Sequence, residues 1–172
     1  MAEHAIPLYP SFGASRIGLK TNKKGVVTFV INKDDFSKVT AFTEHPDRLT
    51  GESSIKSFKK NYDSMYDDIH PNTTFTHWSD GEHYTGVFEI KSFKKKGNQY
   101  HLKTDTLLSE HSDGLLAHDS QYSELAAFFD SSAATDVIRE GSFFLEGSNE
   151  VDKEDFCSWF SDITLDGESI TC

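Results

Sequence analysis

Two histidines and two carboxylates surround one short turn, and these side-chain types bind divalent metals. His77 lies near the end of one strand-like run, and His83 begins the next, with Asp80-Gly81 between them. If the two runs pair across the turn, the histidines approach each other and a carboxylate completes the set. The candidate metal ligands are His77, Asp80, Glu82 and His83.

The same residues also suit a polar hairpin tip that holds no metal, and this is the interpretation that the sequence favours. Histidines are common near turns, and the outer hydrogen-bond partners that a metal site needs are not visible in the sequence. We therefore expect no cofactor and at most a weakly bound divalent cation.

A second polar group follows a predicted strand and consists of Glu44, His45, Asp47 and Arg48. The guanidinium of Arg48 has the shape to clamp a carboxylate or phosphate, with Glu44 or His45 as acid or base. The favoured alternative is structural, because Arg48 beside acidic neighbours forms ion pairs that fix a loop.

The familiar motifs of catalysis are absent from the chain. It has no Gly-x-Ser-x-Gly, no P-loop and no Gly-x-Gly-x-x-Gly. We therefore expect a non-catalytic binding or interaction module of unknown ligand. Two alternatives stay open: a small metal-assisted hydrolase that uses His77 and His83, and a β-barrel that binds a hydrophobic ligand.

The barrel alternative rests on aromatic residues in the predicted strands. Aromatics at alternating strand positions more often form a core than a pocket. The residues concerned are Phe75, Trp78, Tyr84, Phe88, Phe93 and Tyr100.

Apolar patterning predicts mostly strands around these groups. The β-branched run 25–31 is typical of a strand buried on both faces, and 38–43 predicts a second strand that ends before Pro46. Runs 74–78 and 83–90 predict a hairpin around Asp80-Gly81, and 94–98 predicts a turn into a strand at 99–107.

One helix interrupts the strands. Ile55, Phe58, Tyr62 and Met65 recur at spacings of 3, 4 and 3, which places them on one helical face. We expect this helix at about residues 53–66. The fold class is therefore mainly β, an antiparallel β-sandwich or barrel-like structure with one short helix.

The last third gives weaker signals. Segments 142–146 and 162–165 resemble strands, 152–160 suggests a helical turn capped by Asp152, and 122–130 fits either a strand or a helical turn.

Charge divides the chain unevenly. Residues 1–108 hold 15 Lys and Arg against 13 Asp and Glu, whereas residues 109–172 hold 2 against 15. The resulting net charge of −11 disfavours nucleic acid and anionic lipid surfaces. The acidic third either meets a basic partner or a cation, or packs on the core. We expect packing, because it carries seven large aromatics, and hence a single domain over 1–172.

Two cysteines, Cys157 and Cys172, are too few for a disulfide framework, and the sequence favours free thiols over a pair. No stretch is apolar and long enough to span a bilayer, and the N-terminus lacks a signal-peptide pattern. We expect a cytoplasmic protein, or one from which a leader has been removed.

Several short motifs follow one another between residues 39 and 107: Phe42-Thr43-Glu44-His45-Pro46-Asp47-Arg48, the helix, Pro71-Asn72, and Val87-Phe88-Glu89-Ile90. With these motifs the stretch resembles a family of uncharacterised bacterial β-rich proteins. The resemblance implies a compact β-sandwich-like fold without an established activity, and the acidic third departs from that compact pattern.

Overall fold

A computed structural model describes residues 7–21, 26–44, 48–67, 69–79, 82–106 and 137–172. Within these ranges the chain forms twelve strands, two α-helices and a 3₁₀ turn at Lys33–Asp35. The strands are β1 (Leu8–Ala14), β2 (Ile17–Thr21), β3 (Val26–Asn32), β4 (Val39–Thr43), β5 (Leu49–Ser53), β6 (Asn72–Ser79), β7 (Glu82–Lys96), β8 (Gln99–Thr106), β9 (Val137–Ile138), β10 (Gly141–Leu145), β11 (Ser161–Leu165) and β12 (Glu168–Ser169). The helices are α1 (Ile55–Tyr66) and α3 (Lys153–Trp159).

The described strands form one antiparallel sheet in the order β12-β11-β5-β4-β1-β10-β6-β7-β8-β3-β2-β9. The two end strands do not pair with each other, so the sheet is not closed into a barrel. The prediction of a mainly β, antiparallel fold is confirmed.

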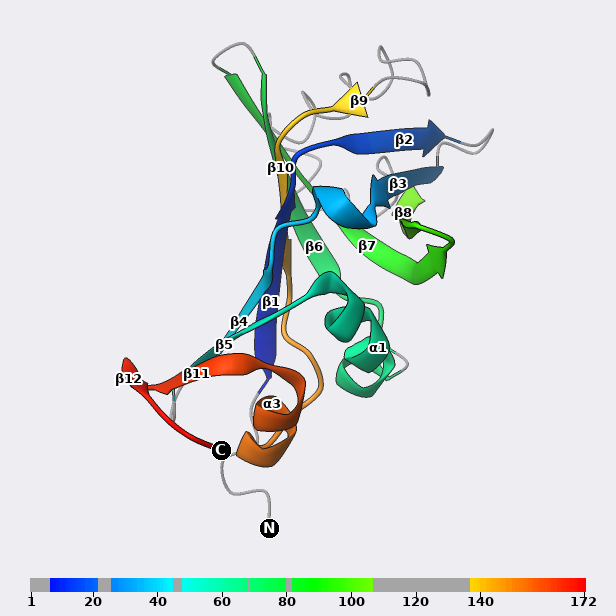
Figure 1. The fold of residues 1–172 in the computed structure, drawn as a ribbon. Coiled ribbons are helices and arrows are strands. Elements are labelled where there is room, and N and C mark those ends of the chain that lie inside the picture. Colours follow the sequence, from blue (N-terminus) through cyan, green and yellow to red (C-terminus); the bar gives the residue numbers. More distant parts are fainter. Residues whose placement is uncertain (1–6, 22–25, 45–47, 68, 80–81, 107–136) are drawn as a thin grey trace.

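The sheet bends at two places, along β7 and between β1 and β2. β7 pairs with β6 along its first part and with β8 along its second, and its register shifts between Ile90 and Ser92. β1 passes into β2 through Ser15 and Arg16. Figure 1 shows the half that contains β2, β3 and β8 set at an angle to the half that contains β1, β4 and β5.

Aromatic side chains fill the space between the two halves. Phe29 of β3 lies with its ring centroid 5.1 Å from that of Phe75, 5.2 Å from that of Phe88 and 5.2 Å from that of Phe143. Phe29, Phe75 and Phe143 are fully buried. The inner face of the bent sheet is therefore a packed aromatic core.

Helix α1 confirms the predicted apolar stripe. Ile55, Phe58, Tyr62 and Met65 are all buried, and the side chain of Ser54 caps the helix by accepting a 3.1 Å hydrogen bond from the Ser57 amide. The helix begins two residues later than predicted, because β5 continues to Ser53.

The last described segment takes part in the sheet. β10 lies between β1 and β6, and β11 and β12 extend the sheet beyond β5. The predicted Asp152 cap is confirmed: its side chain accepts a 2.8 Å hydrogen bond from the Asp155 amide, at the start of a second helix that the fold class did not count. The predicted element at 122–130 lies outside the described residues.

Three expectations need correction. The strand predicted at 25–31 is buried on one face, with Val27, Phe29 and Ile31 inside and Thr28 and Val30 half-buried. The lysines at 94–96 belong to β7, and the turn consists of Gly97 and Asn98 alone. β1, β2 and β5 were not predicted, because their sequences mix Gly, Pro and polar residues and lack a clear alternation.

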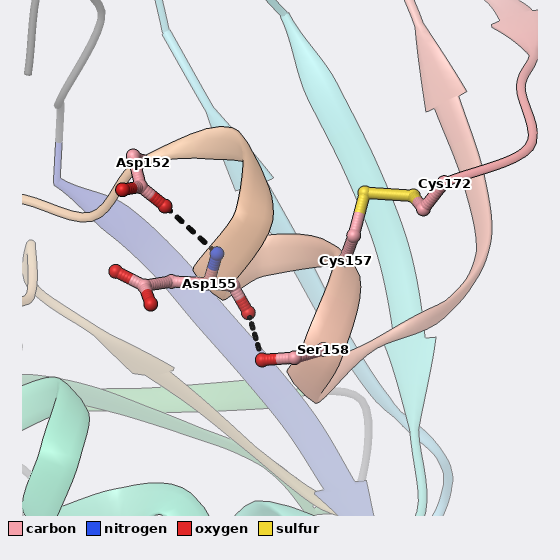
Figure 2. The surroundings of a disulfide bond; sticks show 5 residues. All are labelled: Asp152, Asp155, Cys157, Ser158 and Cys172. Atoms are coloured by element: carbon pink, nitrogen blue, oxygen red, sulfur yellow. Dashed lines mark hydrogen bonds between the residues drawn. A yellow bond between two sulfur atoms is a disulfide. The ribbon is translucent and has the colours of Figure 1, made fainter.

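The expectation of free thiols is wrong. Cys157 in α3 forms a disulfide with the C-terminal Cys172, with Cα atoms 5.8 Å apart, in the usual range for such bonds. Figure 2 shows the bond between the end of α3 and the chain that follows β12. The sequence could not reveal the pair, because the approach of the two cysteines depends on the turn of β11 and β12.

Reduction of this disulfide should lower the melting temperature. The bond closes a loop with a sequence separation of 15, and cross-links of that size contribute about 3 kcal/mol, or about 6 to 12 °C for a domain of this size. Thermal denaturation with and without dithiothreitol measures the effect. The double variant Cys157→Ser, Cys172→Ser should have a lower melting temperature than the oxidised wild type, and dithiothreitol should not change it. A wild-type melting temperature that the reductant leaves unchanged would contradict the expectation.

Gly51→Ala should destabilise the protein by about 1–3 kcal/mol, because β5 lies closely against α3 and β11. A Cβ at Gly51 would stand 2.7 Å from the Cβ of Phe160 and 2.9 Å from Cδ1 of Ile163. The matched control is Gly13→Ala, whose Cβ meets its nearest atom at 3.5 Å. Urea unfolding of both variants measures the difference in stability. Equal stabilities would show that α3 moves enough to accommodate the added methyl group.

Candidate ligand-binding face

The structure places the four candidate metal ligands at different positions of the β6–β7 hairpin. His77 is buried and lies opposite Tyr84 in the register, whereas His83 lies opposite Trp78 and Glu82 lies opposite Ser79. The two histidines are therefore not register partners, and Asp80 falls outside the described residues. Among the residues that the structure describes, no three His, Cys, Asp or Glu side chains gather closely enough to hold a metal ion.

His77 has the surroundings of a structural histidine. Burial lowers the pKa of its imidazole, and backbone hydrogen bonds to Glu140 and Arg139 act in the opposite direction. Gly141, the residue after that turn, is the register partner of His77 on β10. The His77 imidazole thus links β6 to the turn between β9 and β10.

The second predicted group forms the connection between β4 and β5. Glu44 and Arg48 are exposed, and 45–47 lie outside the described residues. The backbone of Arg48 is tied to Asp166: its carbonyl accepts a 2.9 Å hydrogen bond from the Asp166 amide. The connection follows Phe42, which belongs to a cluster that the sequence did not single out.

This ring cluster consists of Tyr9, Phe42 and Phe144, on the side of the sheet that faces away from the core. The strands alternate, so that Leu8, Ala41 and Phe143 point into the core while their neighbours point out. Phe42 is 36% exposed and Phe144 is 40% exposed. We call the outward surface of β4, β1, β10 and β6 the outer face.

The three rings form a triangle. Ring centroids lie 5.3 Å apart for Tyr9 and Phe42, 6.3 Å for Tyr9 and Phe144, and 6.2 Å for Phe42 and Phe144. The Tyr9 ring is inclined by 24° to Phe42 and by 13° to Phe144. Because all three sides are similar, no ring is sandwiched between the other two, and Phe42 and Phe144 keep surface open to a ligand.

An open groove of about 360 Å³ adjoins the ring cluster on the outer face. Six of its eleven lining residues carry a hydroxyl group: Ser11, Ser37, Thr40, Thr74, Thr76 and Ser142. We call it the hydroxyl groove. Within the described residues, the hydroxyls of Ser11, Thr40, Thr74 and Ser142 make no hydrogen bond. They are therefore available to a ligand.

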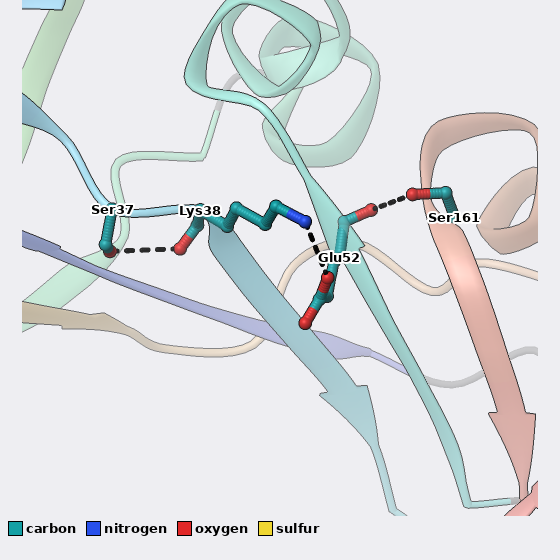
Figure 3. Close-up of polar contacts among 4 residues, drawn as sticks. All are labelled: Ser37, Lys38, Glu52 and Ser161. Carbon is teal, nitrogen blue, oxygen red and sulfur yellow. Dashed lines mark hydrogen bonds and ion pairs between the residues drawn. The ribbon is translucent and has the colours of Figure 1, made fainter. Parts of the chain in front are cut away.

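Among the described residues that line the hydroxyl groove, Lys38 is the one charged side chain, and it is paired. The ammonium of Lys38 lies 3.3 Å from Oε2 of Glu52, and Figure 3 shows the two side chains reaching toward each other from the start of β4 and from β5. The other polar contacts here are to the backbone: Ser37 donates to the Lys38 carbonyl at 3.0 Å and Ser161 to the Glu52 carbonyl at 3.2 Å. The described lining of the hydroxyl groove thus carries no uncompensated charge, in a chain of net charge −11.

Another hollow, of about 360 Å³, lies between α1 and β7. Its charged lining is mixed, with Lys59, Lys91 and Lys94 beside Asp63. Lys91 is already paired with Glu89 at 3.6 Å. This hollow has the weaker case for a ligand, since the described aromatic residues that line it, Tyr62, Tyr66 and Phe93, are buried.

Comparison of the chain with protein-family models, curated proteins and solved structures found no match. The resemblance of residues 39–107 to a bacterial family stays a prediction, so the site rests on the geometry above. In the described part of the chain, neither helix has the length and apolar character that crossing a membrane requires.

Acidification should destabilise the protein through His77. Its folded-state pKa lies below the ordinary value of 6.5, so the unfolded chain takes up the proton first as the pH falls. The free energy of unfolding should therefore decrease as the pH drops below about 6.5, until the folded-state pKa is reached.

Urea unfolding between pH 8 and pH 5, the range in which imidazole titrates, measures how the free energy of unfolding depends on pH. His77→Gln should flatten it. His101→Gln should separately reduce the pH dependence of the free energy of unfolding. The reason is that burial, and then Lys96 and Lys20, also lower the pKa of His101. A slope that His77→Gln leaves unchanged would show that burial of this imidazole does not govern the pH response.

Proposed function

We propose that this protein is a non-catalytic β-sandwich binding module whose ligand lies on the outer face. The observation that carries the proposal is the ring cluster, half exposed and continuous with the hydroxyl groove. Contiguous apolar groups on the surface mark interaction sites far more often than isolated ones do.

The composition of the hydroxyl groove supports binding without catalysis. Among the residues that the structure describes, its lining contains no carboxylate, imidazole or thiol, and Lys38 is its one ionisable residue. General acid–base and nucleophilic mechanisms need such groups within reach of a substrate. Hydroxyls and aromatic rings instead supply contact and orientation.

The aromatic residues of the barrel alternative have another role in the described core. Phe75, Phe88, Phe93 and Tyr100 are buried, and each packs against at least one other ring. Their packing supports a structural role rather than a pocket, which leaves the outer face as the better place for a ligand.

The disulfide supports an oxidising compartment for this module. Bonds such as Cys157–Cys172 persist mainly in secreted, periplasmic or similar surroundings and are uncommon in the cytosol. This weighs against the cytoplasmic location that the sequence suggested.

A panel of chemically distinct probes tests the proposal. We expect at least one of a neutral oligosaccharide, an acidic oligosaccharide, a basic peptide and a short-chain lipid to shift the amide signals of Ser11, Thr40 and Phe144 in ¹H–¹⁵N NMR spectra. The variant Phe42→Ser should weaken that response, because it removes one ring of the cluster, while its melting temperature stays close to wild type.

Two results would contradict the proposal. One is a panel in which no probe moves these amides. The other is a response confined to the hollow between α1 and β7, at Lys59 and Lys94.

A further inference from the structure

We infer that the ligand of the outer face is a neutral glycan, bound as an extended chain across the strands. The inference rests on the proposed function and names its ligand class. Three features support it: the pairing of rings with hydroxyls on the face, the length of the row of side chains across it, and the absence of uncompensated charge in the described groove lining.

The first feature is amphiphilic chemistry at close range. A sugar ring has an apolar face of C–H groups and a rim of hydroxyls, so it needs an aromatic surface beside hydrogen-bonding groups. Phe144 lines the hydroxyl groove and also belongs to the ring cluster, so the two surfaces meet at this residue. An acyl chain would cover the hydroxyls without giving them partners, which costs free energy.

The second feature is a continuous row of side chains. Register partners on four adjacent strands place these residues side by side on the outer face: Thr40, Ser11, Phe144 and Thr74. Three strand spacings give this row a length of roughly 14 Å. That exceeds one sugar ring, and the groove is open, so the geometry fits the interior of a chain better than a single sugar.

The third feature is charge. Among the described residues, Lys38 is the one ionisable side chain of the groove lining and is paired with Glu52, so this lining offers no uncompensated charge to an acidic or a basic ligand. The net charge of −11 repels acidic glycans over the whole molecule. A basic peptide finds no carboxylate in the part of the groove lining that the structure describes. A neutral, hydroxyl-rich chain matches these surroundings best.

Titration with neutral hexasaccharides tests the inference. The probes are cellohexaose, xylohexaose, mannohexaose and maltohexaose, with hexagalacturonate as the acidic counterpart, followed by calorimetry and by the amide signals of Ser11, Thr40 and Phe144. We expect at least one neutral probe to bind more tightly than hexagalacturonate. Raising the ionic strength from about 0.05 M to about 0.5 M should leave that affinity unchanged, because screening affects charged ligands.

Variants locate the binding. Phe144→Ser should weaken the affinity at least tenfold by removing the ring shared by cluster and groove. Thr74→Val, which keeps the shape and removes the hydroxyl, should weaken it several-fold. The matched control is Ile69→Ser, which removes another exposed apolar side chain, one that lines the hollow between α1 and β7, and should have no effect.

The outcomes separate the two claims. If no neutral hexasaccharide binds but a peptide, lipid or acidic probe shifts the same amides, the glycan inference is wrong and the proposed function stands. If a neutral hexasaccharide binds equally well to wild type and Phe144→Ser, the glycan binds elsewhere, and the outer face loses its assigned role.

Discussion

The contact of Phe29 with rings from the other half of the sheet is the interaction on which the structure depends. Phe29 belongs to β3, whereas Phe75, Phe88 and Phe143 come from β6, β7 and β10. A single layer of strands would leave these rings in water, and burying each large ring stabilises the fold by about 1.5 to 3 kcal/mol. The bend at β7, which brings the halves together, therefore follows from the need to bury them.

Packing on the inner face also determines the outer face. Successive side chains of a strand point to opposite sides, so burying Phe143 against Phe29 necessarily turns Phe144 outward. The same alternation on β1 and β4 presents Tyr9 and Phe42 beside it. A shift of register by one residue in β10 would exchange the two phenylalanines and dismantle both the core and the ring cluster. The binding face is thus a consequence of the core.

Local patterns in the sequence were sufficient to predict α1 and the β6–β7 hairpin. The 3.6-residue period of Ile55, Phe58 and Tyr62 and the Asp80-Gly81 turn are signals contained in short windows. The ring cluster has no such signal, because positions 9, 42 and 144 meet through long-range strand pairing. A hint was available in Phe143-Phe144, since two adjacent phenylalanines in one strand cannot both face the core. The burial of His77 has no signal in the sequence, because it depends on the pairing of β6 with β10.

The most direct test of this account compares two adjacent, chemically identical side chains. The free energy of unfolding should fall by about 3–5 kcal/mol in Phe143→Ala, which leaves a cavity beside Phe29 and Phe75. In Phe144→Ala it should fall by about 1 kcal/mol or less, the contribution of an exposed cross-strand pair. Comparable losses in the two variants would contradict the division between an inner face that holds the fold and an outer face free to bind.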